Sequence, residues 1–99
     1  MSLGLRWTEQ AVNQLSAIAE HISLSSPVYA EQVLERVVLR LRQAQQFPES
    51  GRRVPESGHA NARELFEHPY RIVYRVRSEA VEVLAIVHGR QDLPSQAPS

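Results

Sequence analysis

The end of the sequence concentrates side chains that could bind an anion or move a proton. Arg71, Arg75 and Arg77 are interleaved with apolar residues, and Arg90 follows His88 closely. Guanidinium groups bind phosphate or carboxylate through paired hydrogen bonds, and histidine exchanges a proton near neutral pH. For Arg71 and His88, a functional role and an ordinary place on a strand both remain open. We interpret Arg75 and Arg77 as exposed strand arginines.

The composition excludes several other chemistries. The chain has no cysteine, which excludes disulfides, thiol catalysis and cysteine-ligated zinc. It has no lysine either, because all eleven positive charges are arginines, so Schiff-base chemistry and a P-loop lysine are excluded. The four histidines and eleven acidic residues show no metal-ligand spacing, and the serines show no hydrolase pattern. We therefore expect neither a metal nor a cofactor.

Size and charge indicate one small domain without a strong electrostatic field. The 99 residues are 42% hydrophobic, and the formal net charge is zero. That balance gives no field-driven case for nucleic-acid binding. No apolar run approaches the ~20 residues that span a bilayer, and no signal-peptide core is present. We expect a cytoplasmic protein without membrane contact.

Two amphipathic helices are expected ahead of the arginines. A short strand over 3–7 leads into Thr8, a residue type that caps helix N-termini, and helical apolar spacing follows over about 9–23. Gln14 falls on the polar, outward side of this helix. A second helix starts at a serine–proline pair and covers about 27–46. The connection is short, so the two helices form an antiparallel hairpin.

Three strands are expected after a loop over residues 48–61. Alternating patterns cover 70–77 and 80–88, and Ser78-Glu79 between them predicts a two-residue turn. Residues 62–67, which precede a histidine–proline pair, add a third antiparallel strand. The fold class is therefore α+β, an N-terminal helical hairpin packed on a small antiparallel β-sheet in the order β-α-α-β-β-β.

The register of the hairpin decides which side chains share a face of the sheet. Continued without interruption from the turn, it pairs Arg75 with Glu82 and Arg71 with Ile86. The face toward the helices then consists of Tyr70, Ile72, Tyr74, Val76, Val81, Val83, Ala85 and Val87. The opposite face consists of Arg71, Arg75, Arg77, Glu64, Glu82, His88, Val73, Leu84, Ile86 and Phe66. Such a mixed face is typical of a surface that a peptide, a partner chain or RNA covers.

The order of these motifs resembles the RelE/ParE toxin superfamily over about residues 3–94. The resemblance rests on Trp7-Thr8, the helical hairpin, Phe47-Pro48, Gly51-Arg52, Arg63-Glu64-Leu65, Pro69 to Val76 and Val87 to Pro94. It implies a single domain over 1–94, and we expect a disordered tail over 95–99. It also implies a toxin of a type II toxin–antitoxin module, neutralised by an antitoxin that wraps around the hairpin and sheet.

Within the superfamily, the resemblance to the ParE-like branch is favoured. ParE-type members inhibit DNA gyrase by binding, whereas RelE-type members cleave mRNA on the ribosome. The two lysines of RelE-type sites fall on Ala62 and Glu64 here, and the C-terminal tyrosine of many such nucleases is absent. The resemblance therefore implies a gyrase-binding toxin whose target or partner surface comprises Arg71, Arg75, Arg77, Leu84, Ile86, His88 and Arg90.

Two alternatives stay open. A RelE-like, metal-independent endoribonuclease that acts on mRNA at the ribosome would use Glu64 as base, Arg71 and Arg90 as clamps and His88 as acid. Against this, Glu64 close to Arg71 favours a salt bridge. The other alternative is a relative that has lost toxicity and only binds its partner. A homodimer and a heterotetramer with the antitoxin are both compatible with the sequence.

Overall fold

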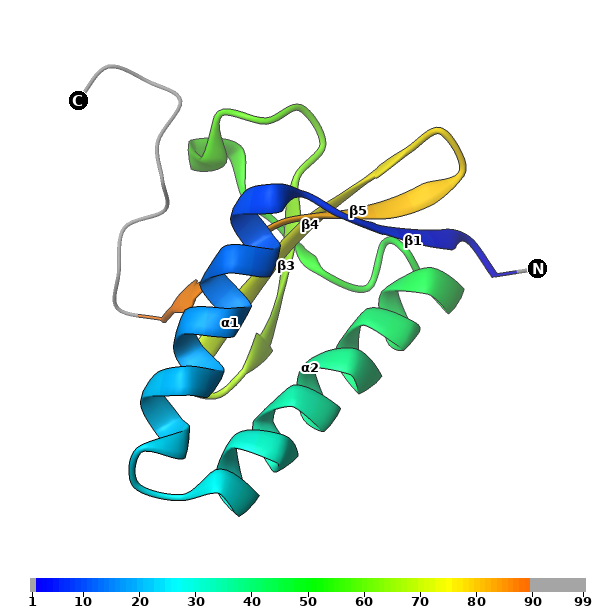
Figure 1. The fold of residues 1–99 in the computed structure, drawn as a ribbon. Helices are drawn as coiled ribbons and strands as arrows, with labels where there is room; N and C mark the ends of the chain where they lie inside the picture. The colour runs from blue at the N-terminus through cyan, green and yellow to red at the C-terminus, as the bar shows by residue number, and fades with distance from the viewer. Residues whose placement is uncertain (1, 90–99) are drawn as a thin grey trace.

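A computed structural model describes residues 2–89, which form two helices on one five-stranded sheet (Figure 1). The elements in chain order are β1 (Gly4–Trp7), α1 (Glu9–Ser23), α2 (Pro27–Gln46), β2 (Arg52–Arg53), the 3-10 helix η1 (Pro55–Ser57), β3 (Arg63–Glu67), β4 (Tyr70–Arg77) and β5 (Ala80–His88). The α+β class and the helical hairpin are confirmed. The residues of the tail expected over 95–99 lie outside the described part of the chain.

Both helices begin where the sequence predicts, because each has a hydroxyl cap. The Thr8 side chain accepts a hydrogen bond from the Ala11 amide at 3.2 Å, and Ser26 accepts one from the Tyr29 amide at 3.1 Å. Pro27 occupies the first turn of α2, where its missing N–H costs no helical bond. In Figure 1, α1 and α2 diverge from their short connection and cover one face of the sheet.

The main core lies between this hairpin and the sheet. The sheet contributes Ile72 and Tyr74 from β4, both fully buried, and Val81 and Val83 from β5. The helices contribute Ala11, Val33, Val37, Leu41 and Ala44. These residues are the apolar stripes predicted from the sequence. Val76, also predicted on this face, is 42% exposed.

The sheet is mixed rather than wholly antiparallel, and it has five strands. Its order is β1-β5-β4-β3-β2, with β1 parallel to β5. The first strand therefore lies beside the last one at an edge of the sheet. The predicted loop over 48–61 also contains strand β2, in which Arg52 pairs with Glu64. The sequence near β1 and β2 does not predict these pairings. Both depend on which distant strand lies alongside in the folded sheet.

The predicted hairpin register holds near the turn and then shifts by one residue. Arg75 pairs with Glu82 and Tyr74 with Val83, but Val73 pairs with Ala85 because β5 bulges. Leu84 and Ala85 therefore both join a second buried cluster with Ala62, Val73 and Val87. Beyond the bulge the faces are exchanged relative to the prediction. Ile86, predicted on the arginine face, belongs to the helix-side core, and Ala85 and Val87 lie on the other side.

Thr8 and helix α1 make hydrogen bonds to backbone groups of β5 near the bulge, where the pairing with β1 ends. The Thr8 hydroxyl donates to the carbonyl oxygen of Val83 at 2.8 Å and lies 3.3 Å from that of Leu84. The Gln14 side-chain oxygen accepts from the Ile86 amide at 2.9 Å. Gln14 therefore points toward the sheet, and its predicted outward position is wrong. A polar residue on a helix flank can face inward when a buried amide needs an acceptor.

Candidate functional site

A buried carboxylate lies at the centre of the sheet face that points away from the helices. Glu64 of β3 has a side chain with no exposed surface. One of its oxygens accepts from Arg52 Nη2 at 2.6 Å and Nε at 3.1 Å. The other accepts from Nε and Nη2 of Arg71, with the Nε contact at 2.7 Å. Strands β2 and β4 flank β3, so the sheet order brings the three side chains together.

This Arg52–Glu64–Arg71 triad is an anion-binding arrangement in which the chain supplies the anion. The hydrogen bond and the charge of Glu64 raise the pKa of Arg52 above its ordinary value. Arg52 has a side chain that is 67% exposed, whereas that of Arg71 is 11% exposed. The predicted Glu64–Arg71 pairing is confirmed. The ion pair of Arg52 with Glu64 was not predicted, because it depends on the pairing of β2 with β3.

Glu64 has no oxygen left for a proton transfer from a substrate. Each carboxylate oxygen already accepts two charge-assisted bonds from guanidinium groups, so neither has a free lone pair directed at a substrate. The arrangement can hold Arg71 rigidly against the sheet. It can also present the outer edge of the Arg52 guanidinium to an anionic group.

The predicted ion pair across the hairpin is present. Arg75 Nε lies 2.7 Å from Glu82 Oε1, and the two residues face each other across β4 and β5. The hydrogen bond from Arg75 lowers the pKa of Glu82 below its ordinary value of 4.5; burial opposes this shift, and the charges of Arg75, Arg77 and Arg6 support it. Arg75 is therefore engaged within the sheet, and Arg77 is the exposed arginine near the turn.

His88 does not lie beside Arg71. Their strand partners show this, because Arg71 pairs with Val87 while His88 pairs with Tyr70. Neighbouring residues on a strand point to opposite faces, so the two side chains lie on opposite sides of the sheet. The ring of His88 meets that of Tyr70 edge-on, with centroids 6.1 Å apart. The predicted convergence of Arg71 and His88 is wrong, and the bulge in β5 is the physical reason.

The other residues predicted to contact a target or partner do not form one exposed surface either. Leu84 is 7% exposed and Ile86 is 1% exposed, so neither offers an apolar contact to a partner without a rearrangement. Arg90 lies outside the residues that the structure describes. Of the seven residues predicted to form one surface, Arg77 and His88 are exposed, and they belong to different ends of the hairpin.

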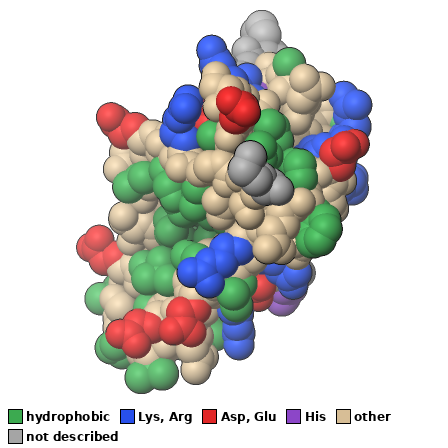
Figure 2. Space-filling model, turned by 90° about the vertical axis from the view of Figure 1, so that its right-hand side faces the viewer, with side chains coloured by type: hydrophobic (Ala, Val, Ile, Leu, Met, Phe, Trp, Pro, Cys, Tyr) green, Lys and Arg blue, Asp and Glu red, His purple; other side chains and the backbone are tan. Residues whose placement is uncertain are grey.

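Metal and membrane chemistry find no support in the described part of the chain. Within residues 2–89, no group of three or more histidine, cysteine, aspartate or glutamate side chains could hold a metal ion. Neither described helix is long and apolar enough to cross a membrane. On the side of the molecule shown in Figure 2, acidic and basic side chains are interspersed with hydrophobic ones and form no single basic surface.

The arrangement of a helical hairpin on a mixed sheet is the fold of RelE and ParE toxins. The chain resembles a chain in the structure of the chromosomal ParDE TA system from P. aeruginosa, with a TM-score of 0.71, 28% identity, and coverage of 88% of this chain and 96% of that one. RelBE2 of Mycobacterium tuberculosis (TM-score 0.61, 19% identity, covering 89% and 99%) and a free mutant of E. coli RelE (0.57, 20%, covering 91% and 86%) share the fold.

Sequence comparison defines the family more closely. Residues 5–93 match the family described as "ParE toxin of type II toxin-antitoxin system, parDE". The chain is also 33% identical over 92 residues to "Putative toxin Y4kP" of Sinorhizobium fredii, covering 91% of this chain and 92% of that protein. This chain belongs to the ParE toxin family of type II toxin–antitoxin systems.

Proposed function

We propose that this ParE-family chain arrests growth by binding DNA gyrase in the cytoplasm, and that the antitoxin encoded beside it neutralises it. The observation that carries the proposal is the closed Arg52–Glu64–Arg71 triad on the face away from the helices. A surface whose charged groups are already paired is suited to recognition of another surface. It is poorly suited to a chemical step.

Metal-independent RNA cleavage needs a base at the 2′-hydroxyl and an acid at the leaving oxygen, and both groups must reach the same bound phosphate from its two opposite sides. Here the candidate base, Glu64, is capped by two guanidinium groups. The candidate acid, His88, lies across the sheet from Arg71. The residues proposed for an endonuclease therefore do not form one site within the described chain, which favours a binding function.

An antitoxin partner is supported by the family and by exposed apolar side chains on the helical hairpin. The family is that of ParE toxins of type II systems, and the P. aeruginosa relative belongs to a ParDE system. Leu24, Val28 and Leu39 are 82%, 65% and 58% exposed. Several exposed apolar side chains on one hairpin are typical of a surface that another protein covers.

A supercoiling assay with purified gyrase tests the proposal. The wild-type chain should inhibit supercoiling at concentrations comparable to that of the enzyme. Arg77→Glu should weaken inhibition about tenfold, because reversing an exposed charge at a contact slows association and loosens the complex. Arg36→Glu, which makes the same charge change on the exposed side of α2, is the matched control and should inhibit as well as the wild type.

The outcomes separate the proposal from its alternatives. Absence of inhibition at excess toxin would overturn gyrase binding. Cleaved mRNA in a translation reaction that contains the toxin would instead establish the ribosome-dependent endonuclease. Normal growth on induction in a bacterial host, together with antitoxin binding, would establish a partner-binding relative without toxicity.

A further inference from the structure

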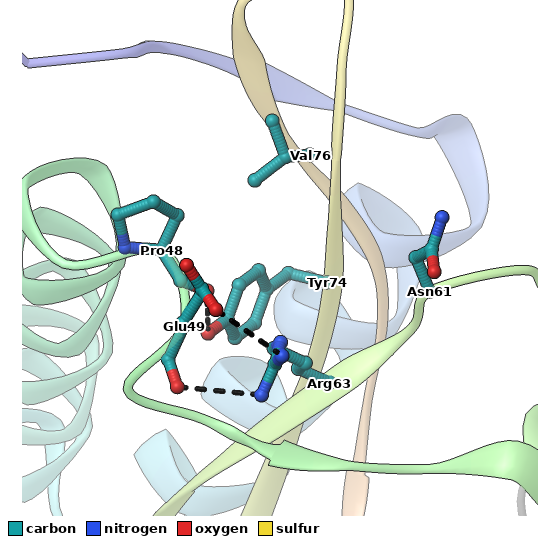
Figure 3. Close-up of a pocket in the computed structure, with 6 residues that line it drawn as sticks. All are labelled: Pro48, Glu49, Asn61, Arg63, Tyr74 and Val76. Atoms are coloured by element: carbon teal, nitrogen blue, oxygen red, sulfur yellow. Dashed lines mark hydrogen bonds and ion pairs between the residues drawn. The ribbon is translucent and has the colours of Figure 1, made fainter.

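A second site lies on the helix side of the sheet, at the β3 and β4 end that the helices leave uncovered. It is a cavity of about 330 Å³ between the segment after α2 and the ends of these strands (Figure 3). It is separate from the triad, because Arg63 pairs with Tyr74 and both face the helix side, whereas Glu64 faces the other side. Its lining residues are Pro48, Glu49, Asn61, Arg63, Tyr74 and Val76.

The guanidinium group of Arg63, which lines this cavity, is held in place by backbone carbonyl groups. Arg63 Nη1 donates to the carbonyl oxygen of Gly51 at 2.9 Å and to that of Glu49 at 3.3 Å. Its side chain is 24% exposed, so a part of the guanidinium remains open to a ligand. Because two carbonyl groups fix the guanidinium, little conformational freedom would be lost when it binds an anion.

The segment that carries these carbonyl groups is itself anchored to the sheet. The Tyr74 hydroxyl donates to the Pro48 carbonyl oxygen at 2.8 Å and accepts from the Gly51 amide at 3.0 Å. A Cβ atom at Gly51 would lie 2.6 Å from that hydroxyl and 2.7 Å from the Glu64 carbonyl oxygen, so only glycine allows this close approach. The cavity is therefore largely preformed.

Glu49 supplies a loose counter-ion at the opening. Its Oε1 lies 3.9 Å from Arg63 Nη2, which is beyond hydrogen-bond distance, and its side chain is 88% exposed. A pair this open contributes little to stability and is easily replaced. The Glu49 carboxylate thus occupies the place that a carboxylate from another molecule could take with better geometry.

Apolar side chains form part of the remaining wall, beside the amide of Asn61. The ring of Tyr74 is fully buried at the base, and Val76, 42% exposed, lies near it with Pro48 (Figure 3). Asn61 lies on the side opposite Glu49 and offers one amide group. One fixed guanidinium beside apolar walls matches an acidic side chain flanked by apolar side chains. A nucleic acid would bring several phosphates to one arginine and an acidic neighbour, which is unfavourable.

We infer that this cavity binds an acidic side chain from an apolar segment of the antitoxin, with Glu49 as the group that it displaces. The inference rests on the proposed function, because it names where and by what chemistry the neutralising partner is recognised. It also gives the segment after α2 a role in recognition. Glu49 contributes to specificity, because a partner must displace its carboxylate from Arg63 to bind in the cavity.

A pair of blocked peptides tests the chemistry directly. Acetyl-Leu-Glu-Leu-amide, titrated into the wild-type chain, should shift the amide resonances of Gly51 and Asn61, and acetyl-Leu-Gln-Leu-amide should not. Glu49→Gln should bind the glutamate peptide about three- to tenfold more tightly, because the competing carboxylate is gone. Equal responses to both peptides, no response, or shifts confined to other parts of the chain would overturn the inference.

The antitoxin encoded beside the chain provides the second arm, with calorimetry as the measurement. Glu49→Gln should tighten the complex, and Arg63→Gln should weaken it about tenfold or more. Glu79→Gln, an exposed acid in the turn between β4 and β5 and outside the helical hairpin, should leave it unchanged. Because Arg63→Gln could also loosen the loop, the gain with Glu49→Gln is the decisive result. If the antitoxin binds all variants equally, the inference fails and the proposed function stands. If it does not bind the wild type, the antitoxin part of the proposed function fails, and the peptide titration still tests the cavity.

Discussion

The carboxylate of Glu64 is buried without contact to water and is held by guanidinium groups from two neighbouring strands. A buried charge is tolerated only when its partners replace the lost hydration, and here four N–H donors do so. Tyr74, by contrast, uses one neutral hydroxyl to tie the segment after α2 to the sheet. Glu64 therefore holds the triad together, and Tyr74 fixes the segment that lines the cavity.

Replacing Glu64 by glutamine tests the triad at this scale. Glu64→Gln removes the charge between two arginines and leaves Arg71, 11% exposed, without its counter-ion. We expect a loss of about 3 kcal/mol in the free energy of unfolding, measured by urea denaturation, because breaking a buried pair strands the remaining charge. Arg52→Gln, which removes the exposed partner, should cost clearly less. Equal losses of unfolding free energy in the two variants would contradict the burial of Glu64 and the exposure of Arg52.

The pair of Arg75 and Glu82 predicts a dependence of stability on pH. Arg75 keeps the pKa of Glu82 below its ordinary value of 4.5, so the folded state favours the ionised carboxylate. This stabilisation is present above the unfolded pKa and is lost as the pH falls through the lower, folded value. Glu82→Gln should therefore be less stable than the wild type at pH 7. The difference should shrink as the pH falls below 4.5, the ordinary pKa of the carboxyl. A stability difference that stays constant over this range would contradict the stabilising role of the ionised pair.

The central feature among the elements is the contact of α1 with the bulge of β5. The bulge lets two successive residues, Leu84 and Ala85, face away from the helices and turns Ile86 toward them. Strand and helix are joined there by the hydrogen bonds of Thr8 to the Val83 carbonyl oxygen and of Gln14 to the Ile86 amide. Helix α1 thus stabilises the irregular register and is not only an apolar cover.

Removing the Gln14 side chain should destabilise the protein through this contact. Gln14→Ala leaves the buried amide of Ile86 without its acceptor, and we expect a cost of about 1–3 kcal/mol in unfolding free energy. The neighbouring Asn13→Ala, at an exposed position of the same helix, should be neutral or slightly stabilising because alanine is the better helix former. Faster hydrogen exchange at Ile86 in the first variant alone would locate the effect. Equal stabilities would refute it.

At the scale of the whole molecule, the sheet separates two surfaces with different chemistry. One face packs on the helices and ends in the Arg63 cavity, and the other carries the triad and a smaller apolar cluster. Arg71 and His88 come from neighbouring strands but belong to different surfaces. A partner that covers one face does not need to contact the other, so target binding and antitoxin binding can use separate residues.

This separation predicts independent effects of Arg71 and His88. In the supercoiling assay, the free-energy costs of Arg71→Gln and His88→Ala should add to within about 0.5 kcal/mol in the double variant. Groups that act together in one catalytic step are strongly non-additive. A double variant no worse than the more impaired single variant would therefore contradict the separation and show that the two residues act at a shared site.

Most of the fold could be predicted from the sequence because its signals are local. The caps at Thr8 and Ser26 act on residues three positions away, and the turn at Ser78-Glu79 adopts positive φ at both residues, as the tightest hairpins require. Helical and strand periodicities likewise compare near neighbours. The helix stripes and the first pairs of the hairpin were therefore correct, as was the Arg75–Glu82 pair.

The sequence by itself determined the helices, the alternating strands, the pairing of Glu64 with Arg71 and the resemblance to the ParE and RelE toxins. Only the tertiary structure decided the parallel place of β1, the part of Arg52 in the triad and the faces of Ile86 and His88. The physical reason is distance along the chain: the hydrogen bonds of Thr8 and Gln14 to β5 join residues 75 and 72 positions apart. No local pattern records such contacts, because they form only when the helix already lies on the sheet.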